Sequence, residues 1–422
     1  MSLTKVPLEM LSGTLPGVVE PDVFNAVSRT DAIANYHPDV GPPVIVTHGY
    51  YTAGDKGGAI YKRVLSEPLH SGKFSIVLSN AVTTVWYEIS MPVVTPDMFG
   101  AKGDDPGDGT GTDDRLAFQS AFNYSRFTSL SPARTYRING TLYIPRFQQI
   151  RGVGGRSSSG FFVETGQTSA TRLVFTGSGT SCWENQDPTL MLSHGALGGF
   201  DMYVKGTYTY MMFFRDLLSF ELFDIGMETA STTMQGLWTR KILDANPSWL
   251  NQMINVSIRL PDNSTGAPLD VDWSDSAIER SQFTGGSGSI DRGYGIRFVN
   301  CQIERSNYAG LIILKTGTVA AKNTSCSNCT FDANKTHGIL FLAQSDTSGT
   351  KKFHTTITGN HFRTEDPNTG TPGGATIGFI NTAGGTYTVG PITGNQEQSN
   401  LVPQFSQTGS WSTPSNTGNM QA

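Results

Sequence analysis

The sequence predicts an all-β chain that winds as a right-handed, single-stranded parallel β-helix, and three observations carry this prediction. Apolar anchor residues recur at spacings of 20 to 33 residues, and only one segment has the pattern of a capping amphipathic helix. The 422-residue chain also contains 48 Gly but only 15% charged residues. Many turn formers with few charges and 10% aromatic residues favour short strands joined by turns.

The clearest repeat aligns FVNCQIERSNYAGLIIL, which starts at Phe298, with CSNCTFDANKTHGILFL, which starts at Cys326. The alignment matches Ile303 with Phe331 and Glu304 with Asp332. Looser copies place the other apolar anchors at Met202, Ile225, Ile258, Phe283 and Phe362. Propeller blades need roughly 40 residues each, and the frame of leucine-rich repeats is missing. A β-helix fits these spacings, with equivalent residues of adjacent coils about 4.8 Å apart.

Four parts follow one another along the chain. Residues 1–43 combine a short helical patch (Leu3 to Leu11) with Pro-rich connections, and residues 44–92 alternate as the strands of a small β module. Residues 93–400 carry a helix at 112–124 and then the coils, of which we expect nine or ten. Residues 401–422 form a tail rich in Gly and Ser.

The helix at 112–124 is expected to cap the open end of the β-helix, which otherwise exposes apolar core and strand edges. Thr112 is a suitable N-cap, and Asp113 and Asp114 favour the first helical turn. The preceding run GDDPGDGTGTDD is interpreted as a tight turn. A calcium loop of the EF-hand type needs Glu at its twelfth position, where Arg115 stands.

The segment FGAKGDDPGDGTGTDDRLAFQSAF (Phe99 to Phe122) resembles the opening motif of the pectate-lyase-like β-helix superfamily, from which it departs by the insertion PGDGTG. The pieces GYYTAGDKGGAIYKRV, HSGKF and VWYEIS resemble the small β module that precedes such β-helices in bacteriophage tailspikes. This resemblance covers about residues 45–125. It implies a homotrimer that binds, and commonly cleaves, a bacterial surface polysaccharide, with residues 1–43 attaching to another tail or baseplate protein.

Charge and hydropathy agree with a virion protein that acts at the bacterial surface. The net charge of −5 gives no reason to expect a nucleic-acid partner. No apolar run approaches the roughly 18 residues of a membrane span, and the first residues lack the apolar core of a signal peptide. We therefore expect synthesis in the host cytoplasm, release by lysis and no membrane insertion. Neither a cofactor nor a metal is expected.

Glu304 and Asp332 are the first candidates for catalysis. Each follows an inward anchor, so both side chains are expected to point outward from adjacent coils. Carboxyl groups about 5 to 5.5 Å apart suit a retaining glycosidase, whereas wider pairs suit an inverting one. Adjacent carboxyl groups also tend to share a proton, as an acid catalyst requires. The alternative interpretation is two solvated carboxylates beside Arg305.

Two further groups of residues compete with this pair. Asp201 and Asp224 each precede an anchor and form a rival outward pair. The segment DVDWSDSAIER combines Asp275 and Glu279 with Trp273, whose ring is a suitable platform for a sugar. It follows a Pro- and Asn-rich loop, where binding residues are common, although a core tryptophan in a turn is equally compatible.

Glycoside hydrolysis is preferred, but two alternatives stay open. A lyase needs a base and a group that neutralises a uronate, for which Tyr308, His337 and Arg305 are available. A non-catalytic receptor-binding spike could use the same outward face. The pair Cys326 and Cys329 lacks a second pair of zinc ligands, and Cys301 matches Cys329 one coil away, so stacked core thiols are predicted.

Overall fold

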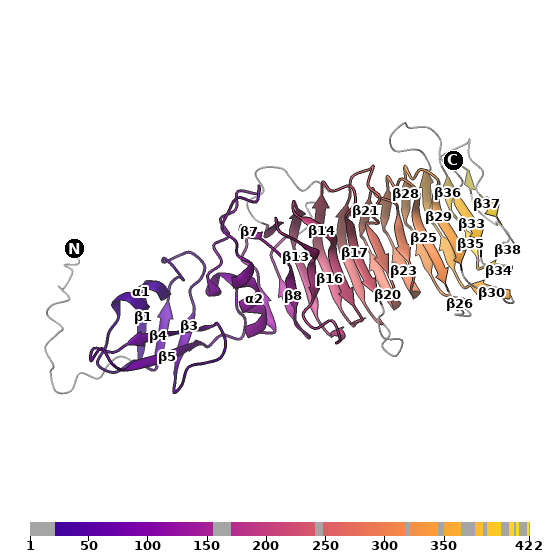
Figure 1. Cartoon of the computed structure of the whole chain (residues 1–422). Helices are drawn as coiled ribbons and strands as arrows, with labels where there is room; N and C mark the ends of the chain where they lie inside the picture. The colour runs from indigo at the N-terminus through magenta and orange to yellow at the C-terminus, as the bar shows by residue number, and fades with distance from the viewer. Residues whose placement is uncertain are drawn as a thin grey trace, which may run out of the picture. The chain divides into compact units, whose positions relative to one another are not determined.

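The computed structural model describes residues 22–154, 170–240, 248–316, 321–344, 350–363, 376–382, 386–397, 405–408, 411–412 and 420–421. The chain divides into two units, Met1–Met91 and Pro92–Ala422 (Figure 1). The helical patch expected at Leu3 to Leu11 lies outside the described residues. Within the described residues, no helix is long and apolar enough to cross a membrane.

The described residues of the first unit form a 5-stranded sheet in the order β1-β2-β3-β5-β4, in which β1 runs parallel to β2 and the other pairs are antiparallel. The strands are β1 (Val23–Ala26), β2 (Val44–Thr47), β3 (Ile60–Val64), β4 (Lys73–Val77) and β5 (Thr84–Ile89). β2 to β5 lie within residues 44–92, where the strands of a small β module were expected. The sheet begins before residue 44, however, because the segment assigned to attachment supplies β1 and helix α1 (Arg29–Asn35).

Helix α1 was not expected from the sequence, although its start carries a local signal. The Ser28 hydroxyl accepts a hydrogen bond from the backbone N–H of Asp31 at 3.0 Å, which satisfies one of the free donors of the first turn. Asp31 adds an acidic group to that turn. The run Ser-Arg-Thr-Asp at residues 28–31 is therefore the pattern that identifies this helix.

The second unit opens with the 3₁₀ helix η2 (Pro96–Phe99) and helix α2 (Arg115–Tyr124). α2 buries Phe118, Ala121 and Phe122, and the two phenylalanines belong to the continuous core of the coils. The helix starts at Arg115, three residues later than expected, with Asp114 as its N-cap residue. Thr112 is not the N-cap because its hydroxyl and its N–H both donate to the Asp104 carboxylate.

The Gly-Asp run before α2 is a turn held by its own carboxylates. The side chain of Asp105 accepts hydrogen bonds from the backbone N–H groups of Gly107, Gly109 and Gly111 at 2.6 to 3.1 Å. Asp114 accepts from the backbone of Lys102 at 2.7 Å and of Gly103 at 3.0 Å. The carboxylates therefore accept hydrogen bonds from backbone N–H groups that a loop would otherwise leave unpaired. This agrees with the interpretation of the run as a tight turn.

Asp114 is expected to make stability depend on pH in an unusual direction. Burial raises the pKa of Asp114 to about 6, from 3.8 in an unfolded chain, although two backbone N–H groups act in the opposite direction. The folded chain thus keeps this proton while the unfolded chain has lost it, so the stabilisation is greatest below about pH 4 and is lost as pH rises through 6. Thermal unfolding of wild type and Asp114→Asn at pH 4.5 and 7 measures this. The free energy of unfolding of wild type, relative to that of the variant, should be about 1–3 kcal/mol higher at pH 4.5 than at pH 7. If the two proteins show the same dependence of stability on pH, the raised pKa of Asp114 is contradicted.

The coils of the second unit build three parallel sheets, which we call sheets I, II and III (Figure 1). Sheet I has 18 strands among the described residues, and most coils contribute two of them. They are β6 (Phe127–Ser129), β7 (Thr135–Ile138), β9 (Gln149–Arg151), β10 (Arg172–Phe175), β13 (Ala196–Val204), β16 (Glu221–Thr229), β18 (Gln252–Arg259), β20 (Ser274–Glu279), β21 (Gln282–Thr284), β23 (Tyr294–Val299), β24 (Gln302–Glu304), β27 (Ser325–Ser327), β28 (Thr330–Asp332), β31 (Thr356–Thr358), β32 (His361–Arg363), β35 (Ile392–Thr393), β36 (Gln396–Glu397) and β39 (Met420–Gln421).

Sheet II has 10 described strands, one from each coil, which agrees with the expected coil number. They are β8 (Leu142–Ile144), β11 (Ser178–Asn185), β14 (Thr207–Arg215), β17 (Gln235–Arg240), β19 (Leu269–Val271), β22 (Ser289–Asp291), β25 (Ala309–Thr316), β29 (His337–Gln344), β33 (Ile377–Asn381) and β37 (Phe405–Thr408).

The strands of sheet III that the structure describes lie in the last coils and are β26 (Ala321–Lys322), β30 (Thr350–Phe353), β34 (Thr386–Val389) and β38 (Trp411–Ser412). The short pair β12 (Leu192–Ser193) and β15 (Leu217–Leu218) completes the described strands. β37, β38 and β39 pair with β33, β34 and β36, so the described parts of the expected tail 401–422 continue the three sheets.

An inward ladder of apolar residues fills the coils of sheet I. It runs through completely buried side chains at equivalent positions: Leu173, Met202, Met227, Ile258, Phe283, Ile303, Phe331 and Phe362. One expected anchor is wrong. Ile225 pairs with Phe200 and Val256, and Met227 is the true partner of Met202. Both residues are buried, so apolarity alone did not distinguish them.

A turn with positive φ separates the two strands that each coil gives to sheet I. The φ angles lie between 48° and 66° at equivalent positions in successive coils: Asp224, Asn255, Arg280, Asn300, Asn328, Gly359 and Gly394. Asn residues adopt this conformation more readily than most, which explains the matched Asn300 and Asn328. Cys301 and Cys329 come next and are buried, free thiols, as the repeat predicted. The thiol of Cys301 donates to the carbonyl of Ile278 at 3.3 Å.

Candidate active site on the outer face of sheet I

Two polar rows lie on the outer face of sheet I, on either side of the inward ladder, because side chains alternate between the faces of a strand. The charged row follows the ladder by one residue and consists of Tyr203, Glu228, Arg259, Thr284, Glu304, Asp332 and Arg363. The amide row precedes the ladder and consists of Asp201, Gly226, Ser257, Gln282, Gln302, Thr330 and His361.

Glu304 and Asp332 are direct partners in adjacent coils, on β24 and β28. The Glu304 carboxylate accepts hydrogen bonds from Gln282 at 2.8 Å, Thr284 at 3.1 Å and Gln302 at 2.6 Å. All three donors are neutral, and two of them belong to the amide row. Both oxygens of Glu304 are therefore held in place by side chains of its own coil and the preceding one.

Asp332 has a different partner from Glu304. Its Oδ1 lies 2.5 Å from Nε of Arg363, the next member of the charged row. Asp332 therefore has a cationic partner, whereas the hydrogen-bond donors to Glu304 are neutral. Glu304 and Asp332 are paired in register on adjacent coils, whose backbones are about 4.8 Å apart, and a retaining glycosidase needs carboxyl groups about 5 to 5.5 Å apart.

Glu228 occupies the same position in its coil as Glu304, and the sequence interpretation did not select it. With Met227 as the anchor, Glu228 follows the inward ladder by one residue, whereas the expected anchor Ile225 put Asp224 beside the ladder. Burial raises the pKa of Glu228, and the charge of Arg259 in the next coil acts in the opposite direction. A half-buried carboxyl group that holds its proton more tightly is suited to act as an acid.

The rival pair Asp201 and Asp224 is not brought together. Asp201 is buried and pairs with Gly226, not with Asp224. Asp224 occupies the positive-φ turn, where its Oδ1 accepts a hydrogen bond from the side chain of Asn255 at 2.6 Å. Asp224 therefore belongs to the turn. The positive φ at this residue bends β16, so Asp224 is a member of neither the charged row nor the amide row.

The cluster around Trp273 separates in the structure. Trp273 is 0% exposed, so its ring is a core side chain and is not available for a sugar. Asp275 is exposed and lies near the start of β20, with φ of 45°. Glu279 lies on β20, where it pairs with Ile254 and Val299, and the turn at Arg280 separates it from the charged row. The exposed tryptophan nearby is Trp249, at 46%.

The three residues considered for a lyase lie around the turn between β24 and sheet II. The guanidinium of Arg305 is bound by the Asp262 carboxylate, so it already has an anionic partner. Tyr308 is 38% exposed, and its backbone carbonyl accepts two hydrogen bonds from Thr336. His337 is half-buried, its Nδ1 lies 3.1 Å from the Thr336 hydroxyl, and burial lowers its pKa.

Stacked parallel sheets around an apolar interior define a parallel β-helix, and solved structures of this class include bacteriophage tailspikes. One similar structure is the tailspike protein gp49 from Acinetobacter baumannii bacteriophage Fri1, a capsular polysaccharide depolymerase. Its TM-score is 0.64 at 14% identity, over 94% of this chain and 70% of that chain.

Two further structures share the fold. The gp42 tailspike of Acinetobacter phage vb_AbaP_AS12 has a TM-score of 0.56 at 13% identity, over 95% of this chain and 74% of that chain. ORF18 of Geobacillus virus E2 has a TM-score of 0.52 at 14% identity, over 92% and 74% of the two chains. No family model and no curated protein matches the sequence. At these identities the likeness establishes the fold, which confirms the expected β-helix.

Proposed function

We propose that this chain is a phage or prophage tailspike that binds and cleaves a bacterial surface polysaccharide from within the polymer. The observation that carries the proposal is the adjacent pair Glu304 and Asp332 in a charged row on the outside of a β-helix. Two tailspikes share this fold, and one of them is described as a capsular polysaccharide depolymerase. A polymer that lies along the coils meets side chains of several coils at once.

Glycoside hydrolysis is the reaction that this pair supports best. Asp332, beside Arg363, is assigned as the nucleophile, and Glu304 is assigned as the acid and then the base of a retaining mechanism. Glu304 has to take up a proton before it can protonate the leaving oxygen. The Gln and Thr side chains around it can reorient their hydrogen bonds because amide and hydroxyl groups both donate and accept.

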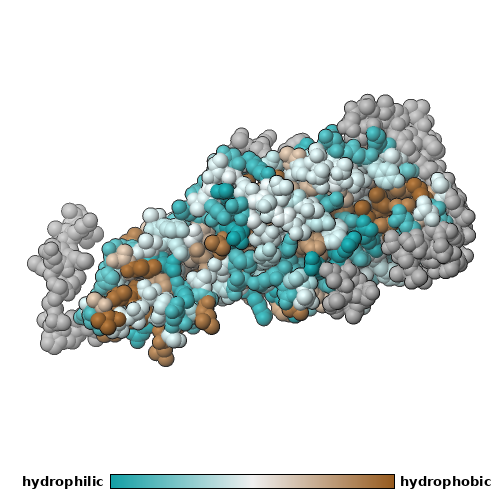
Figure 2. Space-filling view, viewed as in Figure 1, coloured by the Kyte–Doolittle hydropathy of each residue, from teal (hydrophilic) through white to brown (hydrophobic). Residues whose placement is uncertain are grey.

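Self-association into a trimer is part of the proposal. A second apolar cluster, separate from the main core, lies on sheet II, and Figure 2 shows hydrophobic residues at the place where Figure 1 labels β25 and β29. Four of its members are buried and three are half-buried. It consists of Ile290, Ala309, Ile312, Leu314, Leu340, Leu342 and Ile380. The half-buried members, Ile290, Leu342 and Ile380, come from three coils and give sheet II apolar area outside the main core, as interfaces between subunits require. Attachment to another tail protein through residues 1–43 places the protein at the virion tail.

The test is incubation of the purified protein with a panel of capsular polysaccharides, exopolysaccharides and O-antigens. Reducing ends and the absorbance of unsaturated uronates are followed together, and sedimentation reports the oligomeric state. New reducing ends without new absorbance, from a trimer, are the expected result. An increase in both signals identifies a lyase and moves the assignment to Tyr308, His337 and Arg305. Binding without either signal leaves a non-catalytic spike.

A further inference from the structure

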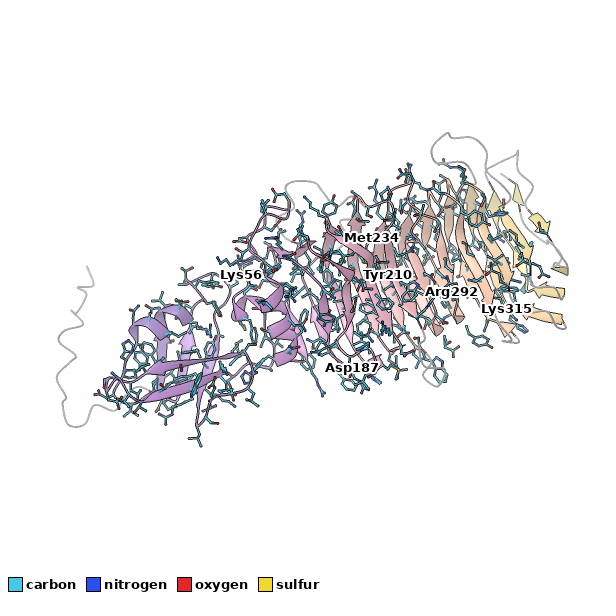
Figure 3. All side chains as sticks on the ribbon, viewed as in Figure 1. Lys56, Asp187, Tyr210, Met234, Arg292 and Lys315 are labelled. Atoms are coloured by element: carbon cyan, nitrogen blue, oxygen red, sulfur yellow. The ribbon has the colours of Figure 1, made fainter. Side chains whose placement is uncertain are left out.

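A second cluster of side chains, on the outer face of sheet II, is not used by the proposed active site. Three aromatic rings lie together there, from Tyr210 and Phe213 on β14 and Trp238 on β17. Their centroids are 4.6 to 5.2 Å apart, and the ring planes differ by 21° to 25°. Phe213 is nearly buried, whereas Tyr210 and Trp238 are half-buried. Figure 3 labels Tyr210 on this part of the coil stack.

Two arginines complete the cluster. The guanidinium of Arg215 lies 5.1 Å from the ring centre of Phe213, and that of Arg240 lies 4.6 Å from the ring centre of Trp238. Arg215 and Arg240 are direct partners in adjacent coils, as are Phe213 and Trp238. Like charges at directly opposed positions of neighbouring strands repel each other, so the arrangement costs stability unless an anion lies between them.

No carboxylate of the described residues forms an ion pair with Arg215 or Arg240, although several other outward arginines have one. Arg292, labelled further along the coils in Figure 3, makes a two-point contact with Asp270 at 2.5 and 2.9 Å. Arg305 is paired with Asp262, and Arg363 with Asp332. The cluster is thus a cationic site whose guanidiniums are positioned by aromatic rings and are not neutralised by the described protein.

We infer that Tyr210, Phe213, Trp238, Arg215 and Arg240 form a subsite for an anionic sugar residue of the polysaccharide. A carboxylate or phosphate carried on a sugar can accept hydrogen bonds from both guanidiniums, which are charged at every physiological pH. The half-buried rings of Tyr210 and Trp238 provide apolar contact together with an O–H and an N–H. This inference rests on the proposed function, and it narrows the substrate to an acidic glycan.

A single-stranded nucleic acid could also use aromatic rings and arginines. The chain disfavours that ligand because its net charge is −5, whereas nucleic-acid-binding domains carry an excess of positive charge. A sugar substituent with one negative charge needs only the two guanidiniums described. The glycan is therefore the ligand that the charges favour.

The experiment measures binding of the full chain to immobilised bacterial polysaccharides and to single-stranded DNA. Wild type is compared with Arg215→Gln/Arg240→Gln, and with Arg297→Gln as a control that removes an exposed charge from sheet I. Each bound polysaccharide is also tested after reduction of its carboxyl groups and after removal of its phosphates. An unchanged melting temperature shows that the double variant is folded.

The expected result is that wild type binds acidic polysaccharides and loses about tenfold or more in affinity when the anionic group is removed. The double variant should bind the native polymer about as weakly as wild type binds the modified one, while the control keeps wild-type affinity. If affinity falls only after reduction of the carboxyl groups, the anionic group that binds is a carboxylate. If it falls only after removal of the phosphates, that group is a phosphate.

Four outcomes overturn the inference. Equal binding of native and modified polymers, or full affinity in the double variant, refutes the anionic subsite and leaves the proposed function intact. Binding of DNA that depends on the two arginines, without glycan binding, assigns the cluster to a different ligand. Failure to bind any polysaccharide removes both the subsite and the proposed function.

Discussion

Asp332→Asn should abolish cleavage of the polysaccharide, with a loss of at least about 10²–10⁴-fold in turnover. The amide keeps the size of the side chain but cannot act as a nucleophile, and it ends the ion pair with Arg363. Glu304→Gln should lose a similar factor because the amide cannot transfer a proton to the leaving oxygen. Turnover is measured by reducing ends with the polysaccharide that the panel identifies.

The matched control for this pair is Asp224→Asn, which changes another outward carboxylate at a turn of the same sheet. It should keep most of the activity, since Asp224 contacts Asn255 and does not belong to the charged row. Binding of the polysaccharide should persist in Asp332→Asn and Glu304→Gln. If both variants cleave at the rate of wild type, the site lies elsewhere, and Glu228 is the next residue to replace because it holds the equivalent position.

Trp273→Ala should lower the free energy of unfolding by about 3–5 kcal/mol. The indole is fully buried among the core side chains of the coils, so its removal leaves a cavity and exposes no binding surface. The measurement is unfolding in denaturant, with rates recorded as well as midpoints, since long stacked folds often unfold irreversibly.

Trp249→Ala is the matched variant for this comparison. Because the Trp249 side chain is 46% exposed, its loss should cost no more than about 0.5 kcal/mol. A large effect on polysaccharide binding with little effect on stability would assign Trp249 to recognition. If Trp273→Ala unfolds at the same denaturant concentration as wild type, Trp273 is not a core residue and the assignment of the interior is wrong.

Most of the fold could be predicted from the sequence because the interior of a β-helix imposes a repeat. The segments that begin at Phe298 and Cys326 align without a gap, and their anchors Ile303 and Phe331 are direct partners. Helix α2 was recognisable from its apolar face, but its first residue was not. Thr112 and Asp114 are both good N-cap residues, and only the loop contacts of the folded chain decide between them.

The pairing of Glu304 with Asp332 in adjacent coils was predictable for the same reason as the fold, whereas the surroundings of the other candidate residues were not. Glu304 and Asp332 are one residue past anchors that are in register. In β16, by contrast, either of two apolar residues, Ile225 and Met227, could be the anchor of the inward ladder. The positive φ at Asp224 also changes which side chains of β16 point inward and which point outward. A short stretch of sequence predicts neither that bend nor the burial of Trp273, because both depend on contacts with neighbouring coils.

The coils differ in length, yet their rows stay aligned. Successive members of the inward ladder are 20 residues apart between Phe283 and Ile303 and 31 apart between Met227 and Ile258. Extra residues are accommodated in the connections and leave the paired strands in place, since each coil contacts only its neighbours. The connecting loops can therefore vary in sequence and length from coil to coil, while the register of the paired strands, and with it the order of side chains along each row, is kept.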